Sequence, residues 1–285
     1  MAAAAKPRFR RPGPGTGAVK VFVNGRLAEA GDTVIDPADR GLTLGDGVFE
    51  TMAVHGGRIA RLAAHLARLR HGAGVLGFAA PMADGDLGAA LDSVVQANAI
   101  TEGVLRLTCT RGPAPRGLLP PETPAPSLII TGAAKASGTG GLVTAVIATA
   151  TRRNEHSPLS RIKSLNYLDN ILAAREAAEK GADEALLLNG AGNLASASAA
   201  NLFAVIDGEL VTPPASDGVL EGVMRADVLR VLGGTERTLS PGDLAGASEA
   251  FLTNCLSIRP LTAVDGTAIG DGRPGPVTEQ AQKLI

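Results

Sequence analysis

The sequence predicts an α/β or α+β protein with two domains. Three observations lead to this class: a length of 285 residues, an alternation of strand-like and helix-like segments in both halves, and a glycine-rich stretch without periodicity at residues 135–141. A chain of this length can bury one large core or two of ordinary size, and alternating strands and helices build sheets that are covered by helices. We therefore expect an N-terminal domain over residues 20–134, a linker over 135–141 and a C-terminal domain over 142–285.

The first half begins with a strand, an Asn24-Gly25 turn and a return strand within residues 21–27. Asn-Gly between two apolar runs is a strong hairpin signal. Residues 59–75 carry leucines at helical spacing and predict a helix. The other elements expected here are a sharp turn at 45–47, a strand at 48–54 that ends in a hairpin at 55–58, a helix at 87–98, and strands at 104–110 and 127–131.

Strands and helices also alternate in the second half, and the chain has no internal repeat. The elements expected there are a strand at 142–148, a helix at 166–179, a strand at 184–188, strands at 202–205 and 209–211 around an Asp207-Gly208 turn, a helix at 224–232 and a strand at 250–253.

Composition excludes several functions. With a net charge of −1 and no Lys/Arg cluster interleaved with aromatic residues, the chain is not expected to bind nucleic acid. No apolar run reaches membrane-spanning length. Residues 1–19 lack the apolar segment of a secretory signal, so we expect a disordered extension there and a cytoplasmic protein. Cys109 and Cys255 lie far apart in apolar contexts and are expected to be buried thiols, and no His/Cys cluster suggests a metal.

Lys163 is the most informative residue of the chain. Of the six lysines, five lie in polar or terminal stretches, whereas Lys163 lies between Ile162 and Leu165, just before an apolar helical run. An amine held in an apolar pocket is more readily deprotonated, and a neutral amine can form an imine with a carbonyl compound. This is the chemistry of a lysine that binds pyridoxal 5'-phosphate (PLP). The alternative is a lysine whose stem snorkels along an apolar surface.

Four further groups of residues occur in the order that would complete a PLP site. They are Asp39 to Thr51 with His65 to Leu69, then Thr110 to Gly117, then Gly192 to Phe203, and then Val219 to Arg225. Together with Lys163 and the following Asn166-Tyr167-Leu168, they resemble the fold-type IV PLP enzymes over residues 21–273. That group includes branched-chain aminotransferases, D-amino-acid aminotransferases and aminodeoxychorismate lyases. The resemblance implies a two-domain, D-amino-acid-aminotransferase-like fold with PLP at the domain interface and Lys163 carried by the C-terminal domain.

The resemblance implies roles for three side chains besides Lys163. Arg68 would hold the cofactor phosphate, whose geometry a guanidinium fork matches, and Arg116 would bind a substrate carboxylate. Tyr167 would lie against the ring hydroxyl of the cofactor, although its spacing from Lys163 is one residue shorter than in branched-chain aminotransferases. From the residues alone, Arg68 can also be read as part of a solvated helix face, Arg116 as part of a surface loop, and Tyr167 as a core residue.

The last two groups imply further cofactor contacts. Val223 and Met224 would give their backbone amides to the phosphate at a helix start, and Leu220 would pack beneath the pyridine ring. Asn254 lies in the segment that matches the phosphate loop. Ser196 stands where the family normally has a glutamate that keeps the pyridine nitrogen protonated. A hydroxyl cannot stabilise a pyridinium comparably, so we expect slow transamination.

Local differences select one member of the family. Leu42, Leu118 and Thr253 to Leu256 differ from D-amino-acid aminotransferases, whereas Gly222 to Arg225 and Ala199 to Phe203 resemble aminodeoxychorismate lyase. That enzyme releases pyruvate from 4-amino-4-deoxychorismate to give 4-aminobenzoate for folate biosynthesis. We therefore expect a PLP-dependent lyase that acts on a small-molecule amino substrate as a homodimer, with no membrane or nucleic-acid partner. The alternatives are a class IV transaminase of branched-chain or D-amino acids and a catalytically impaired PLP-binding homologue.

Overall fold

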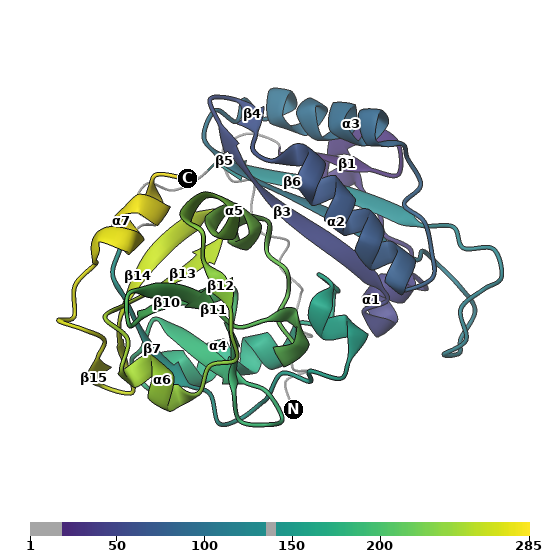
Figure 1. Cartoon of the computed structure of the whole chain (residues 1–285). Helices are drawn as coiled ribbons and strands as arrows, with labels where there is room; N and C mark the ends of the chain where they lie inside the picture. The colour runs from purple at the N-terminus through teal and green to yellow at the C-terminus, as the bar shows by residue number, and fades with distance from the viewer. Residues whose placement is uncertain (1–18, 135–140) are drawn as a thin grey trace, which may run out of the picture.

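The computed structural model describes residues 19–134 and 141–285, which form two lobes, each built on one sheet (Figure 1). The first sheet uses only strands from the first described stretch, and the second uses only strands from the second. The mixed α/β class expected from the sequence is therefore confirmed. The extension expected at residues 1–19 and the linker expected at 135–141 lie almost entirely outside the described residues.

The first sheet has six strands, all antiparallel, in the order β2-β1-β6-β5-β3-β4. Its hairpins follow from local turn chemistry, because Asn24 and Gly25 both adopt the positive φ that a tight hairpin turn requires. The strands are β1 (Lys20–Val23), β2 (Arg26–Glu29), β3 (Gly47–His55), β4 (Arg58–Ile59), β5 (Gly103–Thr110) and β6 (Ser127–Ala134).

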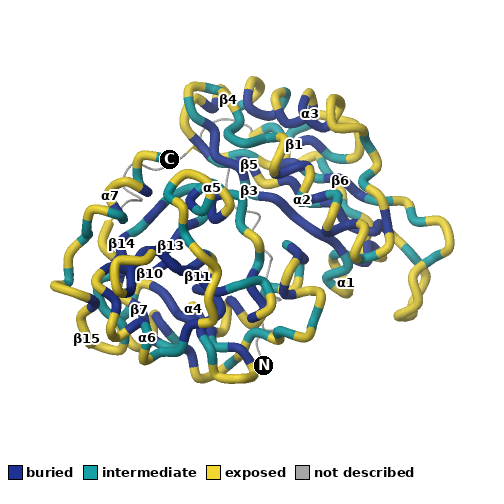
Figure 2. Tube along the Cα trace, viewed as in Figure 1, coloured by how far each residue is buried: buried dark blue, intermediate teal, exposed yellow. Residues whose placement is uncertain are grey.

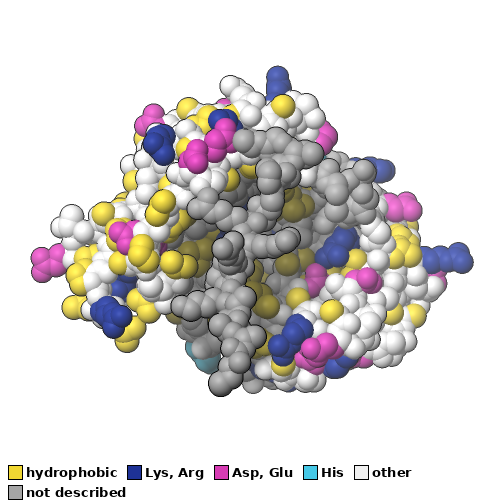
Figure 3. Space-filling model, turned by 180° about the vertical axis from the view of Figure 1, so that it is seen from behind, with side chains coloured by type: hydrophobic (Ala, Val, Ile, Leu, Met, Phe, Trp, Pro, Cys, Tyr) yellow, Lys and Arg dark blue, Asp and Glu magenta, His cyan; other side chains and the backbone are white. Residues whose placement is uncertain are grey.

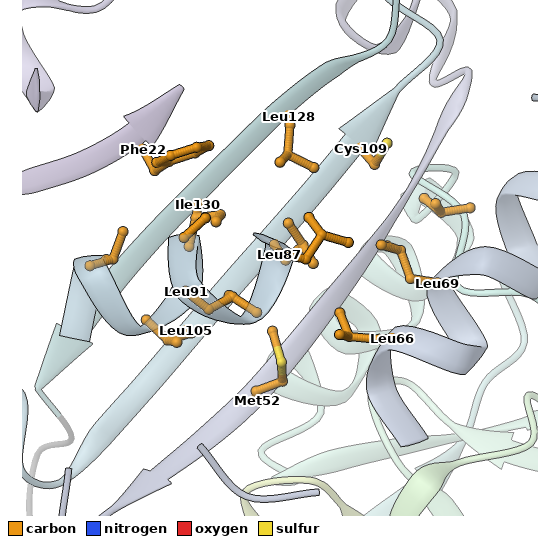
Figure 4. Close-up of a cluster of buried hydrophobic side chains, with 14 of the residues drawn as sticks. Phe22, Met52, Leu66, Leu69, Leu87, Leu91, Leu105, Cys109, Leu128 and Ile130 are labelled. Carbon is orange, nitrogen blue, oxygen red and sulfur yellow. The ribbon is translucent and has the colours of Figure 1, made fainter. Parts of the chain in front are cut away.

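Two helices, α2 (Leu62–Val75) and α3 (Asp84–Ala97), cover one face of this sheet (Figures 1 and 4). Their apolar stripes point at the strands: Leu69 and Leu91, which are almost fully buried, face the side of the sheet that carries Met52. Each such side chain contributes roughly 1.5–3 kcal/mol when it leaves water. Short helical pieces connect the remaining chain: η1 (Ala30–Asp32) and α1 (Arg40–Leu44).

The second sheet has nine strands, in the order β12-β11-β10-β13-β14-β7-β8-β9, with β15 paired to β14. Its pairs β11–β12, β14–β7 and β7–β8 are parallel and the others antiparallel. The strands are β7 (Val143–Ile147), β8 (Glu184–Leu188), β9 (Leu194–Ala197), β10 (Asn201–Ile206), β11 (Glu209–Thr212), β12 (Thr235–Glu236), β13 (Glu249–Asn254), β14 (Ser257–Val264) and β15 (Thr267–Ala268).

Helices pack against the second sheet and position the site. Helix α4 crosses over between the parallel strands β7 and β8, and α5 and α7 pack on β13. The stacked rings of Phe203 and Phe251, with centroids 5.1 Å apart, form the core beneath α5 and α7. The helical elements are η2 (Pro158–Arg161), α4 (Leu168–Glu179), η3 (Ala215–Asp217), α5 (Val223–Leu232), α6 (Pro241–Ala245) and α7 (Pro276–Gln282).

The segment around Lys163 ties the two lobes together. It comes from the second described stretch, yet its backbone pairs with the start of β3: the Phe49 amide donates to the Lys163 carbonyl (2.9 Å), and the Leu165 amide donates to the Gly47 carbonyl (2.9 Å). Lys163 is therefore held by the backbone of the first sheet, and its side chain lies at the boundary between the lobes.

Several expected elements have different bounds in the structure. The helix expected from residue 59 begins at Leu62, because residues 58–59 form β4 and Arg61 has a φ of 54°. The helix expected from residue 166 begins at Leu168, and Tyr167 is its N-cap. Strands β9, β12, β14 and β15 and helices α1, α6 and α7 were not expected. Strand β9 is a short run of small residues, and β14 contains Pro260, which argues against a central strand.

Burial and charge follow the layered architecture. The central strands are buried along most of their length, and the exposed residues gather in turns and on outer helix faces (Figure 2). On the face shown in Figure 3, basic and acidic side chains are interspersed rather than gathered into a patch of one sign. No helix in the described part of the chain is long and apolar enough to cross a membrane.

Candidate active site

A cavity of about 710 Å³, counted with the space that is open to solvent, lies at the boundary between the two lobes. Its lining comes from segments far apart in the sequence and includes Arg68, Arg153, Leu159, Ile162 to Ser164, Asn166, Tyr167, Asn170, Ser196 to Asn201, Leu220, Gly222 to Met224, and Thr253 to Cys255.

The Lys163 amine faces this cavity from a partly aromatic wall. Its Nζ donates to the Tyr167 hydroxyl at 3.1 Å and lies 4.4 Å from the centre of the Phe49 ring. The Phe49 and Tyr167 rings meet edge to face, with centroids 5.0 Å apart. Such contacts hold the amine in one direction. Lys163 is the one primary amine among the described residues that line the cavity, so it is the group that can condense with an aldehyde there.

Arg68, on α2, provides a fixed cation at the same cavity. Its Nε donates to Glu50 Oε1 (2.8 Å) and its Nη2 to Glu50 Oε2 (2.6 Å), while Nη1 donates to the Glu221 carbonyl (3.2 Å). Burial alone would lower the pKa of Arg68, but the hydrogen bond to Glu50 and the attraction of nearby negative charge, chiefly that of Glu50, together raise the pKa above its ordinary value. The guanidinium is therefore always charged.

The N-terminus of α5 lies beside Arg68. Gly222 is the N-cap, and the first amides of the helix, from Val223 on, have no acceptor within the helix itself. A helix start carries partial positive charge and binds anions. Because Glu221 both receives the Arg68 bond and directly precedes Gly222, the guanidinium and the helix start converge on the same part of the cavity.

The adjoining wall is the end of β13. Thr253 is 1 % exposed, and its hydroxyl is buried without a hydrogen-bond partner among the described residues. An orphaned buried hydroxyl at a cavity wall indicates a missing polar partner. Asn254 lines the cavity, but its side-chain oxygen accepts from the amides of Leu256 (2.9 Å) and Ser257 (3.1 Å) and shapes the turn. Burial raises the pKa of the neighbouring Cys255 thiol.

No Asp or Glu is among the described residues that line the cavity. Ser196 lies on β9 opposite Leu187 and is 8 % exposed. Two buried carboxylates outside the lining are engaged elsewhere. Glu50 is bound by Arg68, and Glu184 accepts from Ser198 Oγ and from Arg259 (2.9 Å).

Of the residues that sequence analysis assigned to a site, eight line this cavity and one does not. The eight are Arg68, Lys163, Tyr167, Ser196, Leu220, Val223, Met224 and Asn254. Arg116 lies on an exposed loop outside the cavity of this chain. The backbone of that loop is held by Arg40, which donates to the carbonyls of Gly117 (3.0 Å) and Leu118 (2.9 Å).

Three residues of this region escaped sequence analysis. Arg153 lines the cavity and fixes the loop before Lys163 by donating to the Ser160 carbonyl (2.6 Å). Arg106 is exposed on β5, and its guanidinium carbon lies 3.8 Å from the centre of the same Phe49 ring that contacts Lys163. Glu50 is fully buried behind Arg68. In the sequence, Arg106 and Glu50 are charged residues within alternating strands, a pattern that ordinarily indicates the solvent face.

Comparison with known proteins shows the family to which the chain belongs. Residues 47–264 match the model of amino-transferase class IV. The D-alanine aminotransferase of Bacillus licheniformis is 32% identical over 278 residues, which is 94% of this chain and 96% of that protein. The chain belongs to the class IV aminotransferase family. Its catalytic chemistry therefore depends on PLP, as sequence analysis expected.

Two solved structures resemble this class IV enzyme closely. The branched-chain aminotransferase of the archaeon Thermoproteus uzoniensis, solved with norvaline, has a TM-score of 0.87 and 28% identity and covers 94% of this chain and 93% of its own. A chain from Legionella pneumophila that bears the provisional name 4-amino-4-deoxychorismate lyase has a TM-score of 0.81 and 28% identity and covers 88% of this chain and 94% of its own. The two-domain fold is confirmed, and another branched-chain aminotransferase of this fold was solved with pyridoxamine 5'-phosphate.

The residues present at the cavity fit PLP. An aldehyde needs an amine, which Lys163 provides, and a phosphate needs a cation and free donors. The charged guanidinium of Arg68, which faces the start of α5, and the unpartnered Thr253 hydroxyl provide these within one cavity of the described residues. The family supplies the identity of the cofactor, and the geometry of this chain is compatible with it.

Proposed function

We propose that this class IV enzyme is a lyase that releases pyruvate from 4-amino-4-deoxychorismate and leaves 4-aminobenzoate. The reaction balances without a second substrate. The C–H bond at the ring carbon that bears the amino group breaks, the C–O bond to the enolpyruvyl group breaks, and the ring becomes aromatic. The enolpyruvate takes up a proton and leaves as pyruvate. When bound, PLP supplies an aldehyde for the substrate amine and a ring that withdraws electrons from the adjacent carbon.

The residues of the chain would divide the work as follows. The Lys163 amine takes the proton from the substrate ring carbon and returns it to the departing enolpyruvate. The Tyr167 hydroxyl, 3.1 Å from that amine, keeps it directed into the cavity. Arg68, the Val223 and Met224 amides and Thr253 would hold the phosphate, and Leu220 would pack against the ring.

The observation that favours a lyase over a transaminase is the absence of a carboxylate from the described lining of the cavity. Transamination stores an electron pair on the cofactor, and a protonated pyridine ring favours that storage. Elimination is driven forward by formation of an aromatic ring and depends less on the cofactor as an electron sink. A serine at position 196 is therefore compatible with elimination and unfavourable for transamination.

The test compares two reactions of the same purified holoenzyme. We expect 4-amino-4-deoxychorismate to give pyruvate and 4-aminobenzoate in equal amounts, measured by coupled lactate dehydrogenase and by fluorescence. D-alanine or L-leucine with 2-oxoglutarate should react much more slowly. Faster amino transfer than pyruvate release would contradict the proposal.

A transaminase is the second candidate, and the similarity to D-alanine aminotransferases over nearly the whole chain favours it. Arg106 adds a structural reason. It is exposed and makes no ion pair with another described residue, and its guanidinium carbon and the Lys163 amine lie 3.8 Å and 4.4 Å from the centre of one Phe49 ring. Arg106 therefore offers a cation near the Lys163 segment that could pair with the carboxylate of an amino donor. The substrate comparison above decides between the two.

We also propose that the enzyme acts as a homodimer. Leu118 and Leu119 are 83% and 88% exposed on the loop that presents Arg116. Burial of these exposed apolar side chains against a second surface would lower the free energy. In a symmetric dimer the loop of one subunit could bring Arg116 towards the cavity of the other.

A further inference from the structure

Glu50 is the one fully buried carboxylate that contacts a described residue of the cavity wall, and the reaction proposed above gives it no role. It sits on β3, the strand that also carries Phe49 and pairs with the Lys163 segment. Its two oxygens receive three hydrogen bonds: Oε1 from Arg68 Nε, and Oε2 from Arg68 Nη2 and from His65 Nδ1 (2.7 Å). His65 is 1% exposed and lies on α2, three residues before Arg68.

The geometry of this pair leaves only one edge of the guanidinium available. A bidentate contact through Nε and Nη2 fixes the plane of the guanidinium as well as its position. The edge that carries Nη1 then points to the Glu221 carbonyl and the start of α5. With the Glu50 side chain completely excluded from water and Arg68 only 13% exposed, the pair cannot reorient without leaving buried groups unpaired.

We propose that Glu50 is a positioning residue that makes the site selective for the phosphate of the cofactor. It does so by holding Arg68 in the one orientation in which the guanidinium faces the start of α5, where the Val223 and Met224 amides would bind the same phosphate; we call this place the α5 anion site. The inference rests on the proposed PLP site and adds a requirement to it. Burial would raise the pKa of Glu50, but the bonds from Arg68 and then His65 hold it below its ordinary value, so the group is a carboxylate at neutral pH.

The charge of Glu50 has the opposite effect on phosphate binding from its orientation of Arg68, so the two effects can be told apart. The Glu50 carboxylate also neutralises Arg68, so it weakens the Coulomb attraction between Arg68 and a dianion. If charge dominated, removing the carboxylate would tighten phosphate binding. If orientation dominates, removing it loosens binding, because an amide at this position would place an N–H against the donors of Arg68 or His65.

The experiment titrates full-length protein, freed of its cofactor, with PLP and separately with pyridoxal, which lacks the phosphate. The increase in visible absorption gives both dissociation constants. For Glu50→Gln we expect Kd for PLP to rise at least about tenfold, as metal affinity falls when a residue that orients a metal ligand is removed, while Kd for pyridoxal changes less than about threefold. Glu249→Gln, another buried carboxylate that binds Thr278 rather than an arginine, should leave the ratio of the two constants unchanged.

Glu50→Asp separates the effect of Arg68 orientation from the effect of the carboxylate charge. It also replaces Glu50→Gln as the test if that variant does not fold. It keeps the charge but shortens the side chain, so the bidentate contact is lost; we expect PLP to lose affinity selectively here as well. Tighter PLP binding by Glu50→Gln, wild-type binding by Glu50→Asp, or equal losses for PLP and pyridoxal would each overturn the inference. Failure of the wild-type protein to bind either compound would instead overturn the proposed PLP site.

Discussion

Lys163 and Tyr167 illustrate how the site depends on single residues. The chain has one tyrosine and six phenylalanines, and the tyrosine and Phe49 both contact the Lys163 amine. A phenol can accept a hydrogen bond from an ammonium group or donate one to a neutral amine. The pair therefore stays hydrogen-bonded in both protonation states, which suits an amine that must take up and release a proton.

Under the proposed function, Ser196 is the residue that favours pyruvate release over amino transfer. We expect Ser196→Glu to raise amino transfer relative to pyruvate release by about tenfold or more, which corresponds to about 1.4 kcal/mol in the relative barriers. The reason is that a carboxylate near the pyridine nitrogen would favour its protonation. Initial rates of both reactions with the same preparation measure the ratio.

Ser196→Gln is the matched control, because it has nearly the same shape as the glutamate without the charge. It should not reproduce the effect. The account of Ser196 would fail if both activities of Ser196→Glu moved by the same factor.

Sequence analysis was most informative for residues whose chemistry conflicts with their surroundings. Lys163 stands between apolar neighbours, and the structure brings it into a cavity with seven other predicted residues. Glu50 and Arg106 were missed, because a charged residue in an alternating strand is ordinarily read as belonging to the solvent face. Glu50 instead points into the protein, where Arg68 and His65 from α2 neutralise it, and no sequence pattern reveals a partner 15 or 18 residues away.

At the scale of elements, α5 depends on close packing at its start. A Cβ on Gly222 would collide with the side-chain oxygen of Asn201, whose amide donates to the Leu220 carbonyl (2.8 Å). We expect Gly222→Ala to displace Asn201 and the helix start and to weaken PLP binding roughly fivefold, the effect of losing one hydrogen bond of about 1 kcal/mol. Absorbance titration with PLP measures this change.

Gly246→Ala provides the comparison for that substitution. Its Cβ would meet only ordinary contacts, with the Asp243 carbonyl oxygen at 3.6 Å, and its φ of −87° suits any residue. Cofactor affinity should stay at the wild-type value in this variant. An equal loss of PLP affinity in both variants would show that the start of α5 has no specific role in binding the cofactor.

Helix α4 is tied to the segment after β7 through Glu176. Bonds from Lys180, from the Thr149 hydroxyl and from the Ala150 and Thr149 amides lower the pKa of Glu176 to about 2, from an ordinary value of 4.5. A depressed carboxyl pKa stabilises the fold fully above the unfolded-state pKa, and this contribution is lost as pH falls through the folded-state pKa.

We therefore expect wild-type protein to be more stable than Glu176→Gln at pH 6 and the difference to shrink between about pH 4.5 and pH 2. Urea unfolding at a series of pH values measures the difference. A constant gap between the two proteins across this range would contradict the assignment.

Elements whose residues have a strong local pattern could be predicted from the sequence. Strands that exist only because they pair with a neighbouring strand could not. Helix α2 follows from the helical spacing of its leucines, and the Asn24-Gly25 hairpin follows from its turn residues. Strand β9, which carries Ser196, consists of four small or aliphatic residues and exists because it pairs with β8. Strand β14 tolerates Pro260 because its register with β13 is set by the whole sheet rather than by local propensity.

At the scale of the whole molecule, the catalytic apparatus depends on the meeting of the two lobes. Lys163 is held by the backbone of the first sheet, while the start of α5 belongs to the second lobe. Arg61 adds a further tie, because its Nε donates to Asp227 (2.5 Å) on α5. This arrangement could be expected from sequence only through the resemblance to a family, since no local pattern specifies how two domains dock.

The proposed dimer is tested by Leu118→Glu combined with Leu119→Glu. The wild-type protein should have a mass of about 57 kDa in solution, twice the 28.7 kDa of one chain, and the double variant should be a monomer, because charged side chains oppose burial. Light scattering after size-exclusion chromatography measures the mass at micromolar concentration. Val34→Glu changes another exposed apolar residue (84% exposed) and should leave the mass unchanged; a monomeric wild-type protein would refute the proposal.

Borohydride reduction of the holoenzyme followed by tryptic peptide mass spectrometry shows which lysine holds the cofactor. Reduction fixes a phosphopyridoxyl group on the lysine that holds the cofactor, and trypsin no longer cleaves there. We expect the added mass on the peptide that spans Lys163, and neither a visible absorption band nor a label in Lys163→Ala. Label on Lys20, Lys180 or another lysine, or an unchanged band in Lys163→Ala, would contradict it.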